Sequence, residues 1–356
     1  MPTCLHIIQS AGFESTGIAR IVTGLAQHAG SRGYEVSVLF FADGPLRSAT
    51  DSAGIPVTVI PWRCTRNDAA GVARVWRWLR KHRPDVVHLH HGGLAARTLC
   101  RLAGAKAIVQ HVHEQVLEPD LSPVSSLRFR AADAVIACSQ AVADCLRGCH
   151  AEVVYAGIDA ATVAPAGPPA FGFKIGAASR LIPLKNLEAA IEATARLMGL
   201  GIEVQTEIAG EGPSEASLRA LAARLGTGDR VQFLGWRQNL GELLAPWHLL
   251  VMPSLHEGFP IAALEAMAAG RAVVASRVGG LSELVEDGVS GVLVPAGDTD
   301  ALVRALRELA LNPRRLREMG YEGWKRVHAH FSAQQMAQRT VSIYNRLLNE
   351  KQGQNG

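Results

Sequence analysis

The fold of this chain is decided by one stretch, PSLHEGFPIAALEAMAAG at residues 253–270. The apolar run LLVM at 249–252, directly before it, has the length of a buried strand. Gly258 and Pro260 end that strand, and Pro260 suits the first turn of a helix, where its missing N–H has no partner anyway. The Ala-rich segment that follows favours a helix that stops at Gly270. The stretch therefore predicts a strand, a short loop and a helix.

Two carboxylates in this stretch suggest ligand binding. Glu257 falls in the loop and Glu265 in the helix, beside a helix start whose free N–H groups suit a phosphate. Gly258 removes a side chain where a ligand would approach closely. At ~1.5 Å per residue the carboxylates lie about 12 Å apart, so they would hold two parts of one elongated ligand, with hydroxyl groups as partners. On spacing alone, two ordinary solvated glutamates remain the alternative.

Composition bounds the class of protein. The length of 356 residues suggests two domains, and 48% hydrophobic with 19% charged residues is ordinary for an α/β protein. The net charge of +4 is too mild to indicate nucleic-acid binding. No apolar run approaches the ~20 residues of a membrane span, and the start lacks the basic flank of a signal peptide. The six cysteines show no C-x-x-C spacing, which favours reduced thiols in a cytosolic protein.

The first half alternates predicted strands and helices. Strands are expected at 5–9, 34–40, 86–93, 107–114 and 134–139, with a helix from residue 18 to about 31 and Ser139 as a helix cap. The strand, Gly-containing loop, helix and strand at the start form a βαβ unit. Gly12 and Gly17 do not complete a G-x-G-x-x-G fingerprint, so a dinucleotide site is not indicated. The Pro/Gly-rich segment 164–170 is the predicted linker.

A basic helix is expected at 71–83. Val72, Val75, Trp76 and Leu79 form its apolar face, and Trp78 lies among basic residues. A basic helix with an exposed tryptophan is compatible with an anionic membrane surface. The alternative is an ordinary surface helix packed on the sheet.

Histidines gather at the ends of two predicted strands, at residues 88, 90, 91, 111 and 113, with Glu114 beside them. An H-x-H pair on a strand directs both imidazoles to the same side, which raises a metal hypothesis. No third ligand follows at a recognisable spacing, so the sequence predicts no metal site.

The second half restarts the alternation, with strands at 173–178, 204–209, 231–234, 249–252, 272–275 and 291–294 and helices at 187–198 and 214–225. A further helix is expected at 331–348. Arg180 and Lys185 lie in the loop after the first of these strands and could reach a diphosphate, although solvated surface cations are the alternative. The loop Gly210-Glu211-Gly212 would meet them at the same edge of the sheet.

These residues together resemble glycosyltransferase family 4. The most specific feature is the E-x7-E element from Glu257 to Glu265. Ser179-Arg180-Leu181 with Lys185 resembles the phosphate-binding Arg and Lys of that family. Further similar stretches are IAGEGP at 208–213, VQFLGW at 231–236, the segment 278–298, VVYAGID at 153–159 and RPDVVHLHHG at 83–92.

The resemblance implies the GT-B fold, with two Rossmann-like α/β domains facing each other across a cleft. Residues 1–165 would bind the acceptor, 171–330 the nucleotide sugar, and the helix at 331–356 would pack back on the first domain. The implied reaction is a retaining, metal-independent transfer from a nucleotide diphosphate sugar, UDP before GDP, to a saccharide or lipid-linked acceptor. Such transfers serve cell-envelope or exopolysaccharide synthesis.

The resemblance also implies residue roles. Arg180 and Lys185 would neutralise the diphosphate leaving group, where charge develops in the transition state. Glu257 would bind hydroxyls of the donor sugar and Glu265 those of the ribose, and His113 matches a histidine near the transferred sugar. The remaining donor-binding candidates are Gly17, Gly210, Gly235, Trp236, Arg237, Gly258, Phe259, Pro260 and Ile261.

The chain departs from the family pattern at two places. Thr16-Gly17 replaces adjacent glycines, and Ala156 stands where Asn is usual. A sugar-nucleotide epimerase on the same fold and a non-catalytic sugar-nucleotide-binding scaffold stay open as alternatives. The expected partners are a nucleotide sugar and an acceptor, without nucleic acid, cofactor or required metal. The expected location is cytoplasmic, free or peripherally at the inner face of the membrane.

Overall fold

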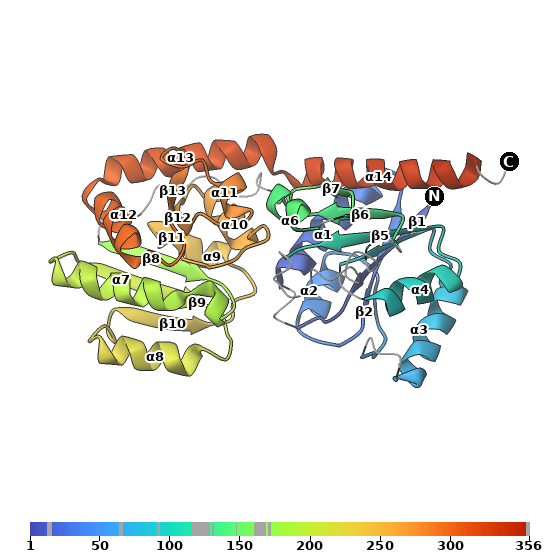
Figure 1. The fold of residues 1–356 in the computed structure, drawn as a ribbon, viewed down its shortest axis with the longest axis horizontal. Coiled ribbons are helices and arrows are strands. Elements are labelled where there is room, and N and C mark those ends of the chain that lie inside the picture. Colours follow the sequence, from blue (N-terminus) through green and yellow to red (C-terminus); the bar gives the residue numbers. More distant parts are fainter. Residues whose placement is uncertain are drawn as a thin grey trace. The chain divides into compact units, whose positions relative to one another are not determined.

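The computed structural model describes residues 1–12, 16–63, 67–90, 93–114, 129, 132–146, 148–159, 169 and 172–353. The chain divides into two compact units (Figure 1). Unit 1 comprises Met1–Asp159 and Ala333–Gly356, and unit 2 comprises Ala160–Ser332. The predicted linker at 164–170 falls, apart from Pro169, outside the described residues. The C-terminal helix belongs to unit 1, where it packs against the first helix of the chain.

Unit 1 is built on a parallel sheet. Its described strands are β1 (Thr3–Ile8), β2 (Glu35–Phe40), β3 (Val57–Val59), β4 (Val86–Leu89), β5 (Ala107–Val112), β6 (Ala134–Ala137) and β7 (Ala151–Val153). They lie in the order β3-β2-β1-β4-β5-β6-β7, and each neighbouring pair is parallel. The order reverses between β1 and β4. In such sheets ligands bind at this switch point, beyond the carboxyl ends of the strands.

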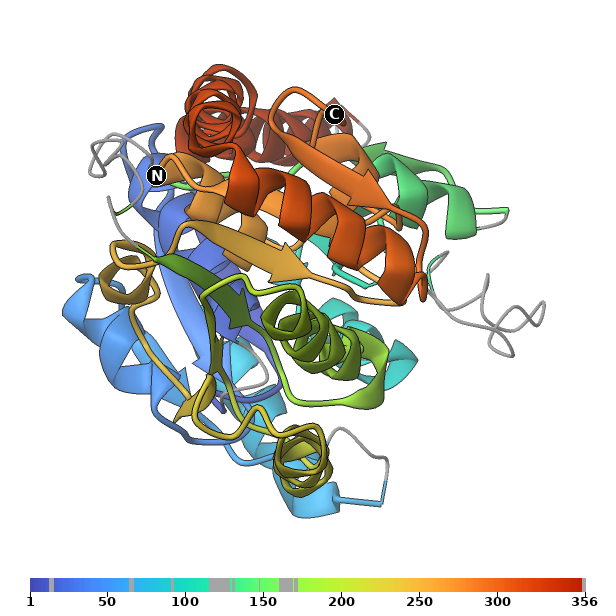
Figure 2. The ribbon, with the colours of Figure 1, turned by 90° about the vertical axis from the view of Figure 1, so that its left-hand side faces the viewer.

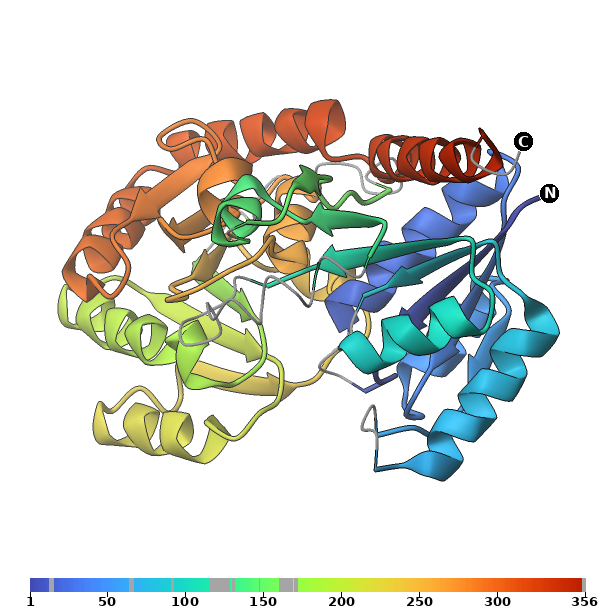
Figure 3. The same ribbon diagram turned by 45° about the vertical axis from the view of Figure 1, so that its right-hand side comes forward.

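The two faces of the unit 1 sheet differ in chemistry. The helices are α1 (Thr16–Gly30), α2 (Leu46–Ser52), α3 (Ala69–His82), α4 (Leu94–Leu102), α6 (Gln140–Cys145) and α14 (Ala333–Gly353). Leu5 and Val87 belong to an apolar cluster with residues of α3 and α4, which lie together on one side of the sheet (Figure 3). His6 and His88, one residue further along each strand, point to the other face, and there His88 contacts Tyr344 of α14.

Unit 2 repeats this topology. Its described strands are β8 (Phe173–Ala178), β9 (Val204–Ala209), β10 (Val231–Gly235), β11 (Leu249–Met252), β12 (Ala272–Ser276) and β13 (Gly291–Val294), in the parallel order β10-β9-β8-β11-β12-β13. Its helices are α7 (Leu187–Gly199), α8 (Glu215–Arg224), α9 (Gly241–Leu244), α10 (Ile261–Ala268), α11 (Leu281–Leu284), α12 (Thr299–Leu311) and α13 (Pro313–His330). In Figure 2, α12, α7 and α8 lie in one layer over the sheet.

Most predicted elements are confirmed, and the differences have simple causes. The strand at 249–252 is β11, and Gly270, at φ 72°, follows the helix that it was predicted to stop. Pro260 is not in the first turn but caps the helix in an extended conformation (φ −78°, ψ 115°), with Ile261 as its first residue. The sequence analysis missed β3 and β7, three-residue strands at the sheet edges that are only partly buried. The sequence analysis also missed several helices, and the longest of these are α12 and α13.

The basic helix α3 exposes a different tryptophan from the one predicted. Trp76 is 41% exposed, whereas Trp78 packs against the apolar cluster of unit 1. Trp78 lies three residues after the buried Val75 and so shares its side of the helix. Trp76 instead lies beside the guanidinium of Arg80, 5.7 Å from the centre of its ring. Within the described part of the chain, no helix is long and apolar enough to span a membrane.

Candidate functional site

The switch point of unit 2, between β8 and β11, carries a buried ion pair. Lys185 follows β8 and Glu257 follows β11, so both lie beyond the carboxyl ends of adjacent strands. Lys185 Nζ is 2.7 Å from Glu257 Oε1, and the side chains are only 14% and 7% exposed. Charges this far from water are stable only when they are paired. The fold thus brings together two of the residues predicted to contact the donor.

Neighbouring groups fix the position of this pair. The hydroxyl of Ser254 donates a 2.7 Å hydrogen bond to the same Oε1 of Glu257. Asn186 adopts a left-handed conformation (φ 47°), and its amide donates to the carbonyl of Pro253 at 3.2 Å. The N–H of Leu255 also donates to the carbonyl of Leu184 at 2.8 Å. These bonds join the two loops directly, so the carboxylate and the ammonium are held in place.

A third loop packs closely against the Arg180 loop. The N–H of Leu181 donates to the carbonyl of Glu211 at 2.9 Å, between Gly210 and Gly212. A Cβ at Gly210, whose φ is 140°, would lie 1.9 Å from the carbonyl oxygen of Ser179. Only glycine fits that position. The predicted meeting of the Gly loop with the Arg180 loop is therefore seen in the structure.

The loop after β10 joins the same edge. Gly235, at φ 68°, accepts a 2.8 Å hydrogen bond from the N–H of Gly210. The N–H of Trp236 lies 3.3 Å from the carboxylate of Glu211. Trp236 is partly exposed, and Arg180 and Arg237 are exposed. Gly235, at the end of β10, and the loop residues Arg180, Gly210, Trp236 and Arg237 thus lie at one edge of the sheet.

The start of α10 contributes backbone more than side chains. Phe259 and Ile261 are only 6% and 9% exposed, and the Phe259 ring packs 5.4 Å from that of Phe331. Gly258 and Pro260 are buried as well. The carbonyl of Gly258 accepts a 2.9 Å bond from the N–H of Gly280. These buried residues support the loop through packing and backbone hydrogen bonds. Glu265, in the second turn of α10, is partly exposed.

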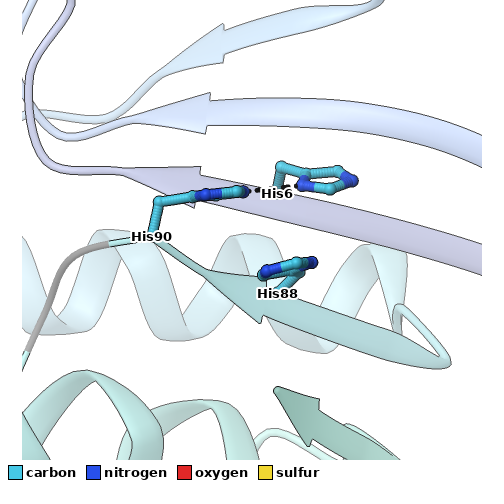
Figure 4. Close-up of side chains that lie close together, drawn as sticks. All are labelled: His6, His88 and His90. Atoms are coloured by element: carbon cyan, nitrogen blue, oxygen red, sulfur yellow. Dashed lines mark hydrogen bonds between the residues drawn. The ribbon is translucent and has the colours of Figure 1, made fainter. Parts of the chain in front are cut away.

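Unit 1 holds the two remaining predicted residues. Gly17 lies in the first turn of α1, and His113 directly follows β5. His113 lies next to other histidines: its Nε2 is 2.9 Å from Nδ1 of His90, and Nε2 of His90 is 2.9 Å from Nδ1 of His6. His91 lies outside the described residues. The switch point between β1 and β4 therefore carries imidazoles (Figure 4). The sequence analysis named the histidines of the two H-x-H patterns in this cluster but not His6.

Comparison with known proteins shows what this chain resembles. Residues 169–326 match a family profile described as "Glycosyl transferases group 1", and residues 15–162 match "Glycosyltransferase Family 4". A D-inositol 3-phosphate glycosyltransferase of Mycobacterium avium is 31% identical over 353 residues, covering 84% of this chain and 82% of the relative. The chain belongs to glycosyltransferase family 4. An MMP alpha-(1->4)-mannosyltransferase of Mycolicibacterium hassiacum is 37% identical over 180 residues, which cover 49% of this chain and 43% of that relative.

The fold of this family 4 member is also that of solved structures. The Anabaena protein HepE, in a crystal structure with UDP and glucose, has a TM-score of 0.84 at 22% identity. The match covers 97% of this chain and all of HepE. The two Rossmann-like units thus belong to the GT-B class. Unit 2, where the ion pair lies, is the part that matches the group 1 profile.

Proposed function

We propose that this protein is a retaining, metal-independent glycosyltransferase. It would transfer a sugar from a nucleotide diphosphate donor, a UDP-sugar before a GDP-sugar, to a saccharide or lipid-linked acceptor. The observation that carries this proposal is the Lys185–Glu257 pair at the switch point of unit 2, with Nζ and Oε1 2.7 Å apart. It supplies one cation for a diphosphate and one carboxylate for sugar hydroxyls.

The ion pair suggests how donor binding proceeds. When the diphosphate arrives, its oxygens replace the Glu257 carboxylate as the partner of Lys185. Oε1 of Glu257, which keeps its hydrogen bond from Ser254, can then accept a second one from a donor hydroxyl. Lys185 and the exposed Arg180 stabilise the negative charge that grows on the leaving diphosphate. In this scheme protein cations perform the role that a metal ion has in other transferases.

The comparisons support the choice of substrates to test. HepE, which shares the fold, is described in complexes with UDP and glucose and with UDP-glucose. The relative from Mycobacterium avium is named for D-inositol 3-phosphate. We therefore place UDP-glucose first among donors, and include D-inositol 3-phosphate beside saccharide and lipid-linked acceptors. Transfer in cell-envelope or exopolysaccharide synthesis is part of the same proposal.

The first test is a thermal-shift screen with UDP, GDP, ADP, TDP and their sugars. A ligand that binds the folded state raises the melting temperature. At a concentration 100 times its Kd it adds about 2.7 kcal/mol to the free energy of unfolding. We expect one base to give a clear shift that Lys185→Ala and Glu265→Ala both reduce. Lys174→Ala is the matched control, because Lys174 forms a similar 2.6 Å pair with Glu207 within the sheet. No shift with any nucleotide would contradict the proposal.

Turnover assays separate the alternatives. A glycosyltransferase releases nucleoside diphosphate much faster with an acceptor than by transfer to water alone, and NMR of the product shows whether the anomeric configuration is retained. An epimerase would isomerise the donor without an acceptor, and a scaffold would bind donor without turnover. Unchanged rates in EDTA are expected for a metal-independent transfer. A rate that depends on added Mg²⁺ would contradict that part.

The membrane part of the proposal concerns α3. Its exposed Trp76 is accompanied by basic side chains, which are Arg74, Arg77, Arg80, Lys81 and Arg83. Such a surface could hold the enzyme near a lipid-linked acceptor. Co-sedimentation with vesicles containing anionic lipid should fall on Trp76→Ala with Arg80→Glu. Equal sedimentation with neutral and anionic vesicles would count against the contact.

A further inference from the structure

We propose that Asn186 is a positioning residue, which keeps the Lys185 and Glu257 loops together after a donor diphosphate has drawn Lys185 away from Glu257. Asn186 directly follows Lys185 and precedes the first residue of α7. Its contact with the Glu257 loop uses an amide and a backbone carbonyl, neither of which takes part in the ion pair. The inference rests on the proposed function, because that function requires the ion pair to open.

The backbone of Asn186 is in an unfavourable conformation. It lies in the left-handed region, at φ 47° and ψ 44°. Of the residues other than glycine that the structure describes, Asn186 and Arg83 alone have a positive φ. A Cβ makes this region unfavourable, although Asn tolerates it better than most residues. Residues in such conformations persist where surrounding contacts hold them, and they are concentrated at functional sites. The contacts of the Asn186 side chain are therefore the next point.

The side chain of Asn186 does not cap the helix that it precedes. Asn is favoured at a helix start because its side-chain oxygen can accept a hydrogen bond from a backbone N–H of the first turn. Asn186 occupies this position before α7, but its side chain makes no such bond. Nδ2 of Asn186 instead donates to the carbonyl of Pro253 at 3.2 Å, and Pro253 is buried. The side chain therefore joins two loops and does not stabilise the start of α7.

Donor binding changes which contacts hold the two loops together. In the donor-free protein the loops are joined by the Lys185–Glu257 ion pair, by the Asn186 amide and by the backbone hydrogen bond from Leu255 to Leu184. In the proposed scheme the diphosphate becomes the partner of Lys185, so the ion pair no longer contributes. The two hydrogen bonds remain. Because misplacing a reacting group by about 1 Å can cost roughly 100-fold in rate, loss of the Asn186 amide should reduce the rate more than the stability.

Two variants separate positioning from stability. Asn186→Gly removes the amide and relieves the strain at φ 47°, whereas Asn186→Ala removes the amide and keeps the strain. We expect both variants to lower kcat about 10–100-fold and to change KM for the donor no more than about threefold, because the charge that Lys185 meets grows in the transition state. The melting temperature of Asn186→Ala should lie about 2–4 °C below that of Asn186→Gly. Wild-type kcat in Asn186→Gly would overturn the inference.

Asn312→Gly is the matched control. Asn312 also precedes a helix of unit 2, and its side chain accepts a 3.1 Å hydrogen bond from the N–H of Arg315 in α13. The substitution removes an Asn side chain of the same size, at a helix start that carries none of the candidate site residues. We expect kcat to stay at the wild-type value. An equal fall of kcat in Asn312→Gly and Asn186→Gly would overturn the positioning role, because the effect would then follow from any lost Asn side chain at a helix start.

A second measurement needs no substrate. Hydrogen exchange of the Leu255 amide, which donates to Leu184, reports on the link between the loops. Lys185→Ala removes the ion pair, as donor binding is proposed to do. We expect Asn186→Gly to speed this exchange at least about tenfold more in Lys185→Ala than in wild type. Equal acceleration in both backgrounds would overturn the inference. If no nucleotide shifts the melting temperature, the proposed function fails, and this comparison alone decides whether Asn186 holds the loops.

Discussion

The two units share a strand order but carry different side chains at their switch points, a charged pair in unit 2 and neutral imidazoles in unit 1. In unit 2 the candidate side chains lie in the loops beyond the strand ends, where Lys185 and Glu257 form a 2.7 Å ion pair. In unit 1 they lie on the strands themselves, where His6 and His88 are register partners and are almost wholly buried. A loop retains some access to water and can hold charge, whereas a strand interior favours neutral rings. The same topology thus yields a charged site and an imidazole cluster.

The difference also lies in what supports each site. The site in unit 2 rests on backbone, because Gly210 and Gly280 allow neighbouring loops to approach more closely than any side chain permits. The cluster in unit 1 rests on side chains, with Tyr344 of α14 reaching His88 from the far end of the sequence. A substitution in the unit 2 site should therefore change rate as well as stability, whereas one in the unit 1 cluster should act chiefly on stability.

Lowering the pH should produce the largest difference in folding stability between the two units. Burial lowers the pKa values of His6, His88, His90 and His111, whereas in unfolded protein these rings take up protons near pH 6.5. The stability that they provide is complete above that pH and is lost as the pH falls. From pH 7.5 to 5 the loss is about 2 kcal/mol for each ring, and the four together approach the stability of a domain.

The measurement is urea unfolding of the protein at both pH values, followed by hydrogen exchange in peptides from each unit. In unit 2, His248 also has a lowered pKa, so a smaller loss is expected there. Cys4 and Tyr344, which contact the rings, have raised pKa values and stay neutral in this range. Equal losses of stability in the two units would contradict the idea that the buried imidazoles make unit 1 the more acid-sensitive.

Lys185→Ala should reduce kcat/KM about 10²–10³-fold, because it removes charge that stabilises the leaving diphosphate. It should also lower stability by about 2–3 kcal/mol, since the buried Glu257 carboxylate loses its partner. Lys174→Ala, in the pair with Glu207, should lower stability without changing kcat/KM. A similar rate loss in both variants would show that the effect on Lys185→Ala is structural.

Gly210→Ala should destabilise unit 2 by about 2–4 kcal/mol and weaken nucleotide binding. Its Cβ would lie 1.9 Å from the carbonyl of Ser179 at a φ of 140°. Gly201→Ala is the control, because Gly201 also has a positive φ (75°) but no atom within 4 Å of the added Cβ. Chemical denaturation and UDP titration of both variants measure the effect. Equal stability of the two would contradict the tight packing of the loops.

Ser254→Ala should have the smallest effect, about 1–2 kcal/mol, because it removes one hydrogen bond to a charged group. The Lys185–Glu257 pair remains, so donor affinity should fall no more than about tenfold. Ser217→Ala removes an exposed hydroxyl on α8 and serves as the control. Isothermal titration with UDP gives the comparison, and a loss as large as that of Lys185→Ala would mean that the hydroxyl has a larger role.

Sequence reasoning placed the strands of unit 2 more closely than those of unit 1, although it missed helices α12 and α13 in unit 2. The strands at 173–178, 204–209 and 249–252 match β8, β9 and β11 residue for residue. Apolar runs that end at glycine or proline carry this information locally. The same local signals placed Lys185 and Glu257 at strand ends. On α3, by contrast, the apolar pattern placed Trp76 on the buried face and was wrong, because the apolar cluster that covers Trp78 is formed by distant residues.

By itself the sequence determined the alternation of strands and helices, the family and the loops that carry the candidate site residues. Only the tertiary structure decided which of these groups touch. It paired Lys185 with Glu257 across 72 residues, and it brought His6 to His90 across 84 residues and Tyr344 to His88 across 256 residues. Local patterns fix where a strand ends, because backbone geometry is local. Contacts between side chains depend on strand order and register, which arise only when the whole sheet forms.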